Sequence, residues 1–190
     1  SQDINVRSES DQLSKTLQEM TGQLRRSNAE NERQSWFKTG QNELAMVMRG
    51  DPEPDVLANS VLQFLVQYLE AQVGVYYLRD GNQLNLIGAY AYRRRNDDRT
   101  AYQLSEGLVG QAAQEKRLII FRDIDPDRLE IQVDTGLGSY APVSVIAMPL
   151  LVDNEVLGVI EIGSLRNYSD FEYEFLERAA ESVAIVLNSA

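Results

Sequence analysis

The sequence predicts an α+β fold in which an antiparallel sheet is flanked by helices and preceded by a long N-terminal helix. Residues 1–49 contain no proline and are rich in polar residues that favour helices. Two pairs of β-rich segments are joined by short turns, as in antiparallel hairpins. A capping-box pattern, Ser-x-x-Glu at residues 169–172, then opens a final amphipathic segment.

The composition excludes several classes of protein. The 190 residues suit one domain plus an appendage, and a hydrophobic content of 43% is enough for a core. A formal net charge of −11 argues against a nucleic-acid binder and against adsorption to an anionic membrane, because both need a basic face. With no cysteine and no histidine, the chain lacks a thiolate, a disulfide and the usual haem or transition-metal ligand.

Neither a long apolar run nor a signal peptide is present in the sequence. We therefore expect a cytoplasmic location. We also expect the chain to be a piece of a longer protein, since it opens inside a helical pattern.

The N-terminal segment carries a narrow apolar seam. Its four members follow a 4-3-4 spacing: Leu13, Leu17, Met20 and Leu24. The same register continues through the polar residues Ser27, Asn31 and Gln34. One interpretation is a lone amphipathic helix lying on the domain. Pairing with a second copy explains the pattern better, because a mostly polar helix has little reason to persist alone in water.

The remaining chain is expected to form one domain over residues 51–189, after the 1–49 helix. Prolines at 52 and 54 break the first helix. The elements predicted after them are a helix to about 70, strands at 73–78, 84–92 and 102–104, a helix at 106–115, a strand at 118–121, strands at 144–152 and 156–164, and a helix from 170. Residues 122–141 have no clear period and are expected to be irregular.

Several short segments, in this order and spacing, resemble a GAF domain over residues 51–189. They are Gly107-Leu108-Val109-Gly110-Gln111-Ala112-Ala113, Ile120-Phe121-Arg122-Asp123-Ile124, Val145-Ile146-Ala147-Met148-Pro149-Leu150 and Leu157-Gly158-Val159-Ile160-Glu161-Ile162. The resemblance implies a GAF-like, PAS-related sheet with a ligand pocket beneath its loop-rich middle.

Two short motifs lie upstream: Gln34-Ser35-Trp36-Phe37-Lys38-Thr39-Gly40 and, after it, Asn42-Glu43-Leu44. Together they are similar to the linker between HAMP and GAF modules in sensor histidine kinases. This resemblance implies a transmembrane sensor before the chain and a kinase core after it, with the parent protein anchored in the inner membrane. Diguanylate cyclases and chemoreceptors share similar linkers and stay as alternatives.

Catalytic and metal-binding motifs are scarce in the sequence. No histidine is present to activate a serine, so this chain is not expected to be an enzyme. The acidic residues of 123–130 suggest a calcium loop, but Arg128 and Asp134 stand where that motif needs glycine and glutamate. A solvated acidic loop is the better interpretation, and no metal site is expected. Gly107-x-x-Gly110 is too short for a nucleotide fingerprint and instead lets a helix start near the sheet.

The residues expected to bind a ligand either surround the loop-rich middle or lie on the strands of the GAF-like segments quoted above. They are Tyr90, Tyr92, Arg93, Tyr102, Arg122, Tyr140, Met148 and Glu161. The arginines at 93–95 and 99 are either an anion clamp or a solvent-exposed loop. Each tyrosine offers ring stacking and a hydroxyl to a small planar ligand, and core or rim packing explains it equally well.

The resemblance also restricts the ligand. GAF relatives that hold bilins through cysteine or haem through histidine are excluded by composition. Asn167-Tyr168-Ser169-Asp170-Phe171 does not reproduce the Asn-Lys-Phe-Asp-Glu motif of cyclic-nucleotide binders, which puts nucleotide binding in doubt. We expect no cofactor. Either an unknown small organic molecule binds, or side chains fill the pocket.

The expected function is a homodimeric signalling module. The helix entering the domain and the helix leaving it are expected to pack side by side, and two copies to form a bundle. The residues expected between chains are Leu13, Leu17, Met20, Leu24, Val183 and Leu187. A ligand or an upstream twist then biases two arrangements of the bundle and passes a signal to an output domain. The alternative is a dedicated small-molecule receptor.

Overall fold

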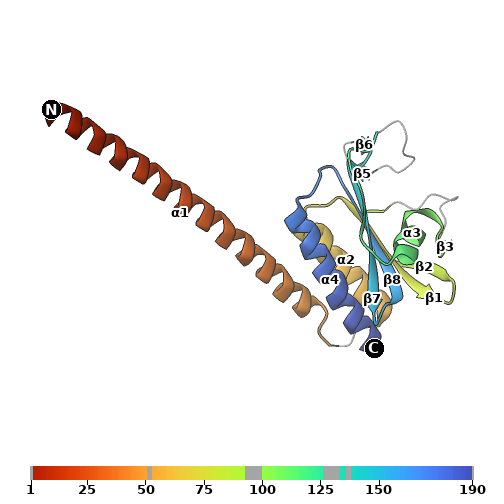
Figure 1. Ribbon diagram of the computed structural model, residues 1–190. Helices are drawn as coiled ribbons and strands as arrows, with labels where there is room; N and C mark the ends of the chain where they lie inside the picture. The colour runs from red at the N-terminus through yellow and green to blue at the C-terminus, as the bar shows by residue number, and fades with distance from the viewer. Residues whose placement is uncertain (1, 51–52, 93–99, 126–132, 136–137, 190) are drawn as a thin grey trace. The chain divides into compact units, whose positions relative to one another are not determined.

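The structure is a computed structural model (Figure 1) that describes residues 2–50, 53–92, 100–125, 133–135 and 138–189. The arginines predicted as an anion clamp, together with Asp127 and Glu130 of the acidic segment, lie outside these residues. The chain consists of two compact units, Ser1–Gln41 and Asn42–Ala190.

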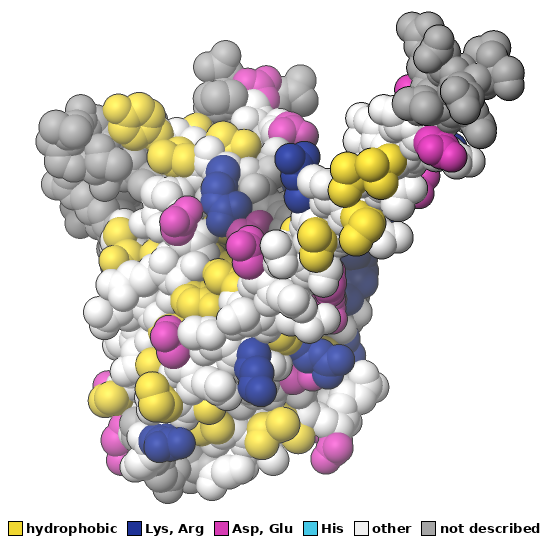
Figure 2. Space-filling view, turned by 90° about the vertical axis from the view of Figure 1, so that its left-hand side faces the viewer, with side chains coloured by type: hydrophobic (Ala, Val, Ile, Leu, Met, Phe, Trp, Pro, Cys, Tyr) yellow, Lys and Arg dark blue, Asp and Glu magenta, His cyan; other side chains and the backbone are white. Residues whose placement is uncertain are grey.

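The first unit consists of most of helix α1 (Gln2–Val47). The helix is 46 residues long, in agreement with the absence of proline and with the polar, helix-favouring composition. All four members of the apolar seam are exposed, at 63% for Leu13, 55% for Leu17, 54% for Met20 and 64% for Leu24. Figure 2 shows hydrophobic side chains on this helix near the grey N-terminal residues. The end of α1 belongs to the second unit, where Leu44 and Met48 are buried.

The second unit is built on a six-stranded antiparallel sheet with strand order β3-β2-β1-β8-β7-β4. Its strands are β1 (Val73–Asp80), β2 (Gln83–Tyr90), β3 (Ala101–Gln103), β4 (Ile119–Phe121), β7 (Ser144–Val152) and β8 (Glu155–Ser164). Every neighbouring pair is antiparallel, and the two predicted hairpins, β1–β2 and β7–β8, are confirmed. At the tight β7–β8 turn Asp153 and Asn154 adopt φ of 47° and 65°, as a two-residue hairpin requires.

A second, two-stranded sheet corrects the sequence prediction for residues 122–141. β5 (Val133–Thr135) pairs with β6 (Gly138–Tyr140) inside the segment that was expected to be irregular. The short strands gave no signal, because three residues are too few to display an alternating pattern.

Helices cover both faces of the large sheet (Figure 1). α2 (Pro54–Tyr68) and α4 (Asp170–Ser189) lie on one face, and α3 (Gly107–Glu115) lies on the other. Two glycines let α2 approach its face closely. A Cβ added at Gly74 would lie 3.0 Å from Val66 Cγ2, and one added at Gly88 would lie 3.0 Å from the Cβ of Ala58. Val75 and Tyr77 alternate with Gly74 along β1, so their side chains point to the other face of the sheet. There they pack with Val159 and α3 in a separate hydrophobic cluster.

The predicted capping box opens α4. The backbone N–H of Ser169 donates to Glu172 Oε2 over 2.8 Å, and the Glu172 N–H donates to Ser169 Oγ over 3.4 Å. Arg166 joins this corner to α2, because its Nη2 donates to Glu172 Oε1 at 2.7 Å and to the Leu69 carbonyl at 3.1 Å. Burial raises the pKa of Glu172, but hydrogen bonds from Arg166 and Ser169 outweigh it and hold the pKa below its ordinary value.

Candidate functional site

The candidate site is centred on Glu161, in the middle of the large sheet on the face that carries α3. Glu161 pairs with Val75 of β1 on one side and with Ala147 of β7 on the other. Residues paired across antiparallel strands point to the same face. Ile119 of β4 pairs with Ala147 and extends this row toward the sheet edge. The row is apolar except for one carboxyl group at its centre.

The carboxyl group of Glu161 has unusual electrostatics. The packing of protein atoms around it raises its pKa from 4.5 to about 7. No hydrogen bond or ion pair to its carboxylate occurs in the described part of the chain, and burial is the cause of the shift. The residue is nevertheless only half-buried, because solvent still reaches it. A carboxyl group with this pKa exchanges a proton near neutral pH.

Two of the predicted tyrosines lie on the same face as Glu161. Tyr92 and Tyr102 are half-buried and pack against the cluster that contains Val75, Tyr77 and Ala147. The ring of Tyr102 meets that of Tyr77 edge-on, with centroids 5.6 Å apart. This packing fixes the orientation of the Tyr102 ring.

Two other predicted ligand residues, Met148 and Tyr90, lie on the opposite face of the sheet from Glu161. Met148 follows Ala147 in β7, so its side chain points to the opposite face, where it is 1% exposed. It lines a different recess of about 300 Å³ beside α4, next to Glu177 and Glu181. Tyr90 pairs with Gly74 and therefore lies on the α2 side.

Arg122 is held against the first turn of α4. Its guanidinium carbon lies 4.8 Å from the centroid of the Tyr173 ring, and its Nη2 lies 3.7 Å from Asp170 Oδ1. Because α4 covers the opposite face, this arginine is not a neighbour of Glu161. Tyr140 lies on β6 and is 51% exposed. Arg93 falls outside the described residues.

One further aromatic residue on the face of Glu161 was not singled out in the sequence analysis. Phe121 pairs with Val145, and Val145 pairs with Gly163, two residues after Glu161 on the same strand. The three side-chain positions therefore share the face of Glu161, and the Phe121 ring is 51% exposed. An exposed phenylalanine inside an apolar strand cannot be distinguished from a buried one until the pairing is known.

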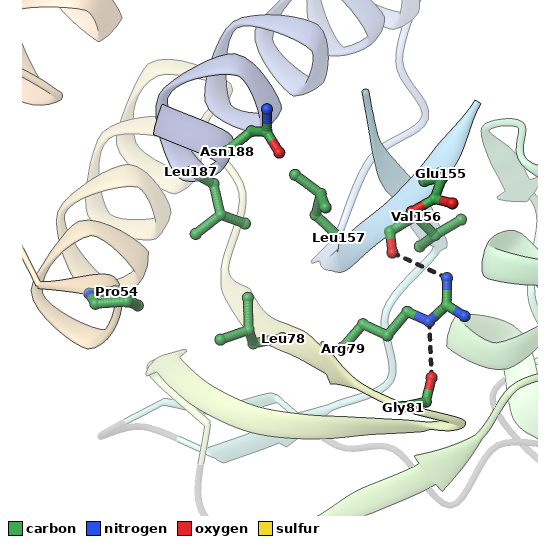
Figure 3. Close-up of a pocket in the computed structure, with 9 residues that line it drawn as sticks. All are labelled: Pro54, Leu78, Arg79, Gly81, Glu155, Val156, Leu157, Leu187 and Asn188. Carbon is green, nitrogen blue, oxygen red and sulfur yellow. Dashed lines mark hydrogen bonds between the residues drawn. The ribbon is translucent and has the colours of Figure 1, made fainter. Parts of the chain in front are cut away.

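A separate pocket of about 490 Å³ lies where α2 begins and α4 ends (Figure 3). Its lining includes the side chains of Leu78, Leu157 and Leu187. Arg79 crosses its floor and donates to the Gly81 carbonyl at 2.8 Å and to the Val156 carbonyl at 3.3 Å. None of the predicted ligand residues lines this pocket, so it is distinct from the Glu161 site.

The predicted interface residues fall into two groups. Leu13, Leu17, Met20 and Leu24 are exposed, and Leu187 is half-buried. Val183 is fully buried in the core of the second unit, so its side chain has no surface left for another chain.

The described residues contain neither a metal-ligand cluster nor a membrane span. No group of three His, Cys, Asp or Glu side chains in them is arranged to hold a metal ion. Asp123, from the acidic segment, accepts a hydrogen bond from Asn167 Nδ2 at 2.8 Å. No helix in the part of the chain that the structure describes is long and apolar enough to cross a bilayer.

Several solved structures have the same fold. The A. aeolicus nlh2 GAF domain in an inactive state is 23% identical, with a TM-score of 0.64 over 82% of this chain and 98% of that one. The GAF domain of an Acinetobacter phosphoenolpyruvate-protein phosphotransferase is 16% identical, with a TM-score of 0.66 over 81% and 94%. Free methionine-R-sulfoxide reductase from Neisseria meningitidis, in complex with its substrate, is 16% identical, with a TM-score of 0.64 over 83% and 90%.

No curated protein matches the sequence. The family described as GAF domain matches residues 51–188, which is more than half of the chain. The chain therefore belongs to the GAF family of regulatory and sensor domains, here preceded by a long N-terminal helix.

Proposed function

We propose that this GAF domain is a homodimeric relay module that passes a signal along its helices to a kinase or another output domain in the same polypeptide. The observation that carries the proposal is the exposed apolar seam of α1. The parent is a sensor histidine kinase in this proposal, which rests on the HAMP–GAF-like linker before Leu44. A cytoplasmic location is part of this proposal, and a membrane anchor in the parent follows from the same resemblance.

The seam supports a second copy of the chain as its partner. Burying a leucine or methionine side chain contributes about 1.5–3 kcal/mol, so a paired seam gains several such contributions. The positions that flank the seam in a coiled coil include Thr16, Thr21 and Gln23, which are uncharged. Two identical chains therefore meet there without like-charge repulsion. The Thr16 and Thr21 hydroxyls donate to carbonyls of their own helix, which satisfies them beside an apolar contact.

The relay step needs two arrangements of the paired helices. A ligand on the sheet favours the arrangement that it binds more tightly. A conformational change arriving through α1 shifts the same equilibrium between the two arrangements. Leu187, near the end of α4, and the exposed Ile185 beside it offer apolar surface where the chain leaves the domain. Val183 takes no part in this interface, because its own chain buries it.

Native mass spectrometry tests the dimer. We expect the unmodified chain to be a dimer, and the double variant Leu17→Gln with Leu24→Gln to be a monomer, because polar groups in the seam lose more by burial than they gain. Met46→Gln is the control, since Met46 is 58% exposed on the same helix but lies off the seam. A double variant that stays dimeric contradicts the proposal.

A second candidate function is a small-molecule receptor, and the half-open carboxyl group of Glu161 favours it. Glu161 has no hydrogen-bond partner among the described residues, and burial disfavours its charged form, so a group that binds the carboxylate would relieve this cost. The same native spectra test this function. A small mass increment that is lost on denaturation supports a receptor, whereas clean protein at every ligand concentration tried counts against it.

We propose that this chain is not an enzyme, although reductases share its fold. Reducing a sulfoxide requires a two-electron reductant, and the sequence has no cysteine thiol to supply the electrons. Incubation with free methionine sulfoxide and a thiol reductant should give no methionine above the protein-free rate. Methionine formation that scales with protein concentration would refute this.

A further inference from the structure

A recess of about 300 Å³ lies at the edge of the large sheet, where β7 continues beyond the end of its neighbour β4. β4 pairs with β7 only from Val145 to Ala147, so in the described structure the later residues of β7 have no strand beside them on that side. Helix α4, which packs against β7, forms one wall of the recess. The turn between α3 and β4 forms the opposite wall. Glu161 does not line this recess.

The floor of the recess is apolar. Met148 is 1% exposed and Ala180 is 5% exposed, so each presents only a small part of its surface there. Leu118 and Leu151 are half-buried around them. Such a lining favours an apolar body, and a methionine thioether also makes favourable contacts with aromatic rings. The volume is at the small end of the range for ligand pockets, so the recess suits a small molecule.

Charges of opposite sign stand on the two walls. Glu177 and Glu181 lie one turn apart on α4, and both are exposed. Arg117 lies on the opposite wall, in the turn that follows α3. Its Nη2 pairs with Glu115 Oε2, which leaves further N–H groups of the guanidinium for another acceptor. Among the described residues, no ion pair crosses the recess from Arg117 to either glutamate of α4.

This arrangement favours a ligand that carries both charges. The two glutamates attract an ammonium group, and the Arg117 guanidinium attracts a carboxylate, because charge-assisted hydrogen bonds are stronger than neutral ones. The amine of Lys116 is engaged outside the recess, where its Nζ donates to the Asn154 carbonyl at 2.6 Å. A purely cationic ligand leaves Arg117 without a partner, and a purely anionic one is repelled by the glutamates.

We infer that the recess binds a small zwitterion, an α-amino acid with an apolar side chain. Its ammonium group meets Glu177 and Glu181, and its carboxylate meets Arg117. Its side chain lies over Met148. This inference goes beyond the relay function proposed above and adds a ligand site that is separate from Glu161. Because α4 forms one wall, the bound ligand ties the helix that leaves the domain to the turn before β4.

Three probes that share one aromatic body but differ in charge test the inference. Phenylalanine is the zwitterion, 2-phenylethylammonium is the cation and 3-phenylpropanoate is the anion. Their Kd values are measured at neutral pH by NMR titration of the full chain. The titration is followed at the backbone amides of Leu118, Leu151 and Ala180, which line the recess.

The variants remove one wall charge at a time. Arg117→Gln removes the positive charge, and Glu177→Gln combined with Glu181→Gln removes the negative charges. Glu174→Gln is the matched control, because Glu174 is exposed on the same helix but does not line the recess. All of these side chains are exposed, so the variants should fold, and their amide spectra away from the recess check that they do.

We expect phenylalanine to bind about threefold or more tightly than either analogue, since each analogue lacks one exposed ion pair. Arg117→Gln should abolish its advantage over the cation, and the double glutamate variant its advantage over the anion. Glu174→Gln should keep both advantages. Equal affinity for the three probes, tightest binding of the cation or the anion, or advantages that survive in the variants overturn the inference. The absence of any shift at these amides at millimolar probe concentration also overturns it. The relay proposal is unaffected by either result, because the native mass of the dimer tests it.

Discussion

At the scale of single residues, Glu161 couples the stability of the fold to pH. Its pKa is raised from 4.5 to about 7 in the folded chain, so folding favours the protonated form. The stability associated with this group is fully present below pH 4.5 and is lost as the pH rises through 7. Above that pH, the native chain carries a poorly solvated charge.

Removing this charge should stabilise the protein in neutral and alkaline solution. We expect the free energy of unfolding of Glu161→Gln to exceed that of the parent at pH 8, by on the order of 3 kcal/mol at most, because a pKa unit corresponds to about 1.4 kcal/mol and solvent screens part of the effect. At pH 4 the difference should nearly vanish. Urea unfolding at both pH values measures this, with Glu155→Gln as control. A Glu161→Gln variant that is less stable than its parent at pH 8 would show that the carboxylate has a stabilising partner.

At the scale of elements, the first turn of α4 depends on its capping box. Ser169→Ala removes the side-chain acceptor for the Glu172 N–H and the hydroxyl that donates to Glu172 Oε2 at 3.0 Å. We expect unfolding to become easier by about 1 kcal/mol, the usual contribution of an N-cap serine. Thermal melts followed by circular dichroism measure the loss.

Ser182→Ala in the same helix is the control for the cap. Its hydroxyl only donates to the Arg178 carbonyl at 3.0 Å, within the helix. Alanine favours helix interiors more than serine does, so this variant should be as stable as the parent or slightly more so. If both variants lose the same stability, then the cap is not what sets the start of α4.

At the scale of the whole molecule, the sequence predicted the order of elements better than the site. Helices and paired strands follow from patterns that extend over eight or more residues, such as β1, β2, β7 and β8, and the turns between them have a recognisable chemistry. β5 and β6 have three residues each and left no such pattern.

The candidate site was only partly predictable, because its residues are selected by face and register. Met148 and Ala147 are neighbours in sequence, yet the pleat sends them to opposite sides of the sheet. Arg122 directly follows Phe121, so the same alternation directs its side chain to the opposite face, where it lies beside Tyr173 and Asp170. Glu161 was identified, whereas its apolar neighbours Val75 and Ala147 come beside it only through strand pairing.

The strand order also affects how the chain folds during synthesis. β1 and β8 are far apart in sequence but adjacent at the centre of the sheet. While the ribosome has released only the chain up to β7, the β1–β2 hairpin and the later strands have no partner to join them. Pairings between such distant segments form slowly. The nascent domain therefore presents unpaired strand edges until its last quarter emerges, and this interval is when it most needs protection from aggregation.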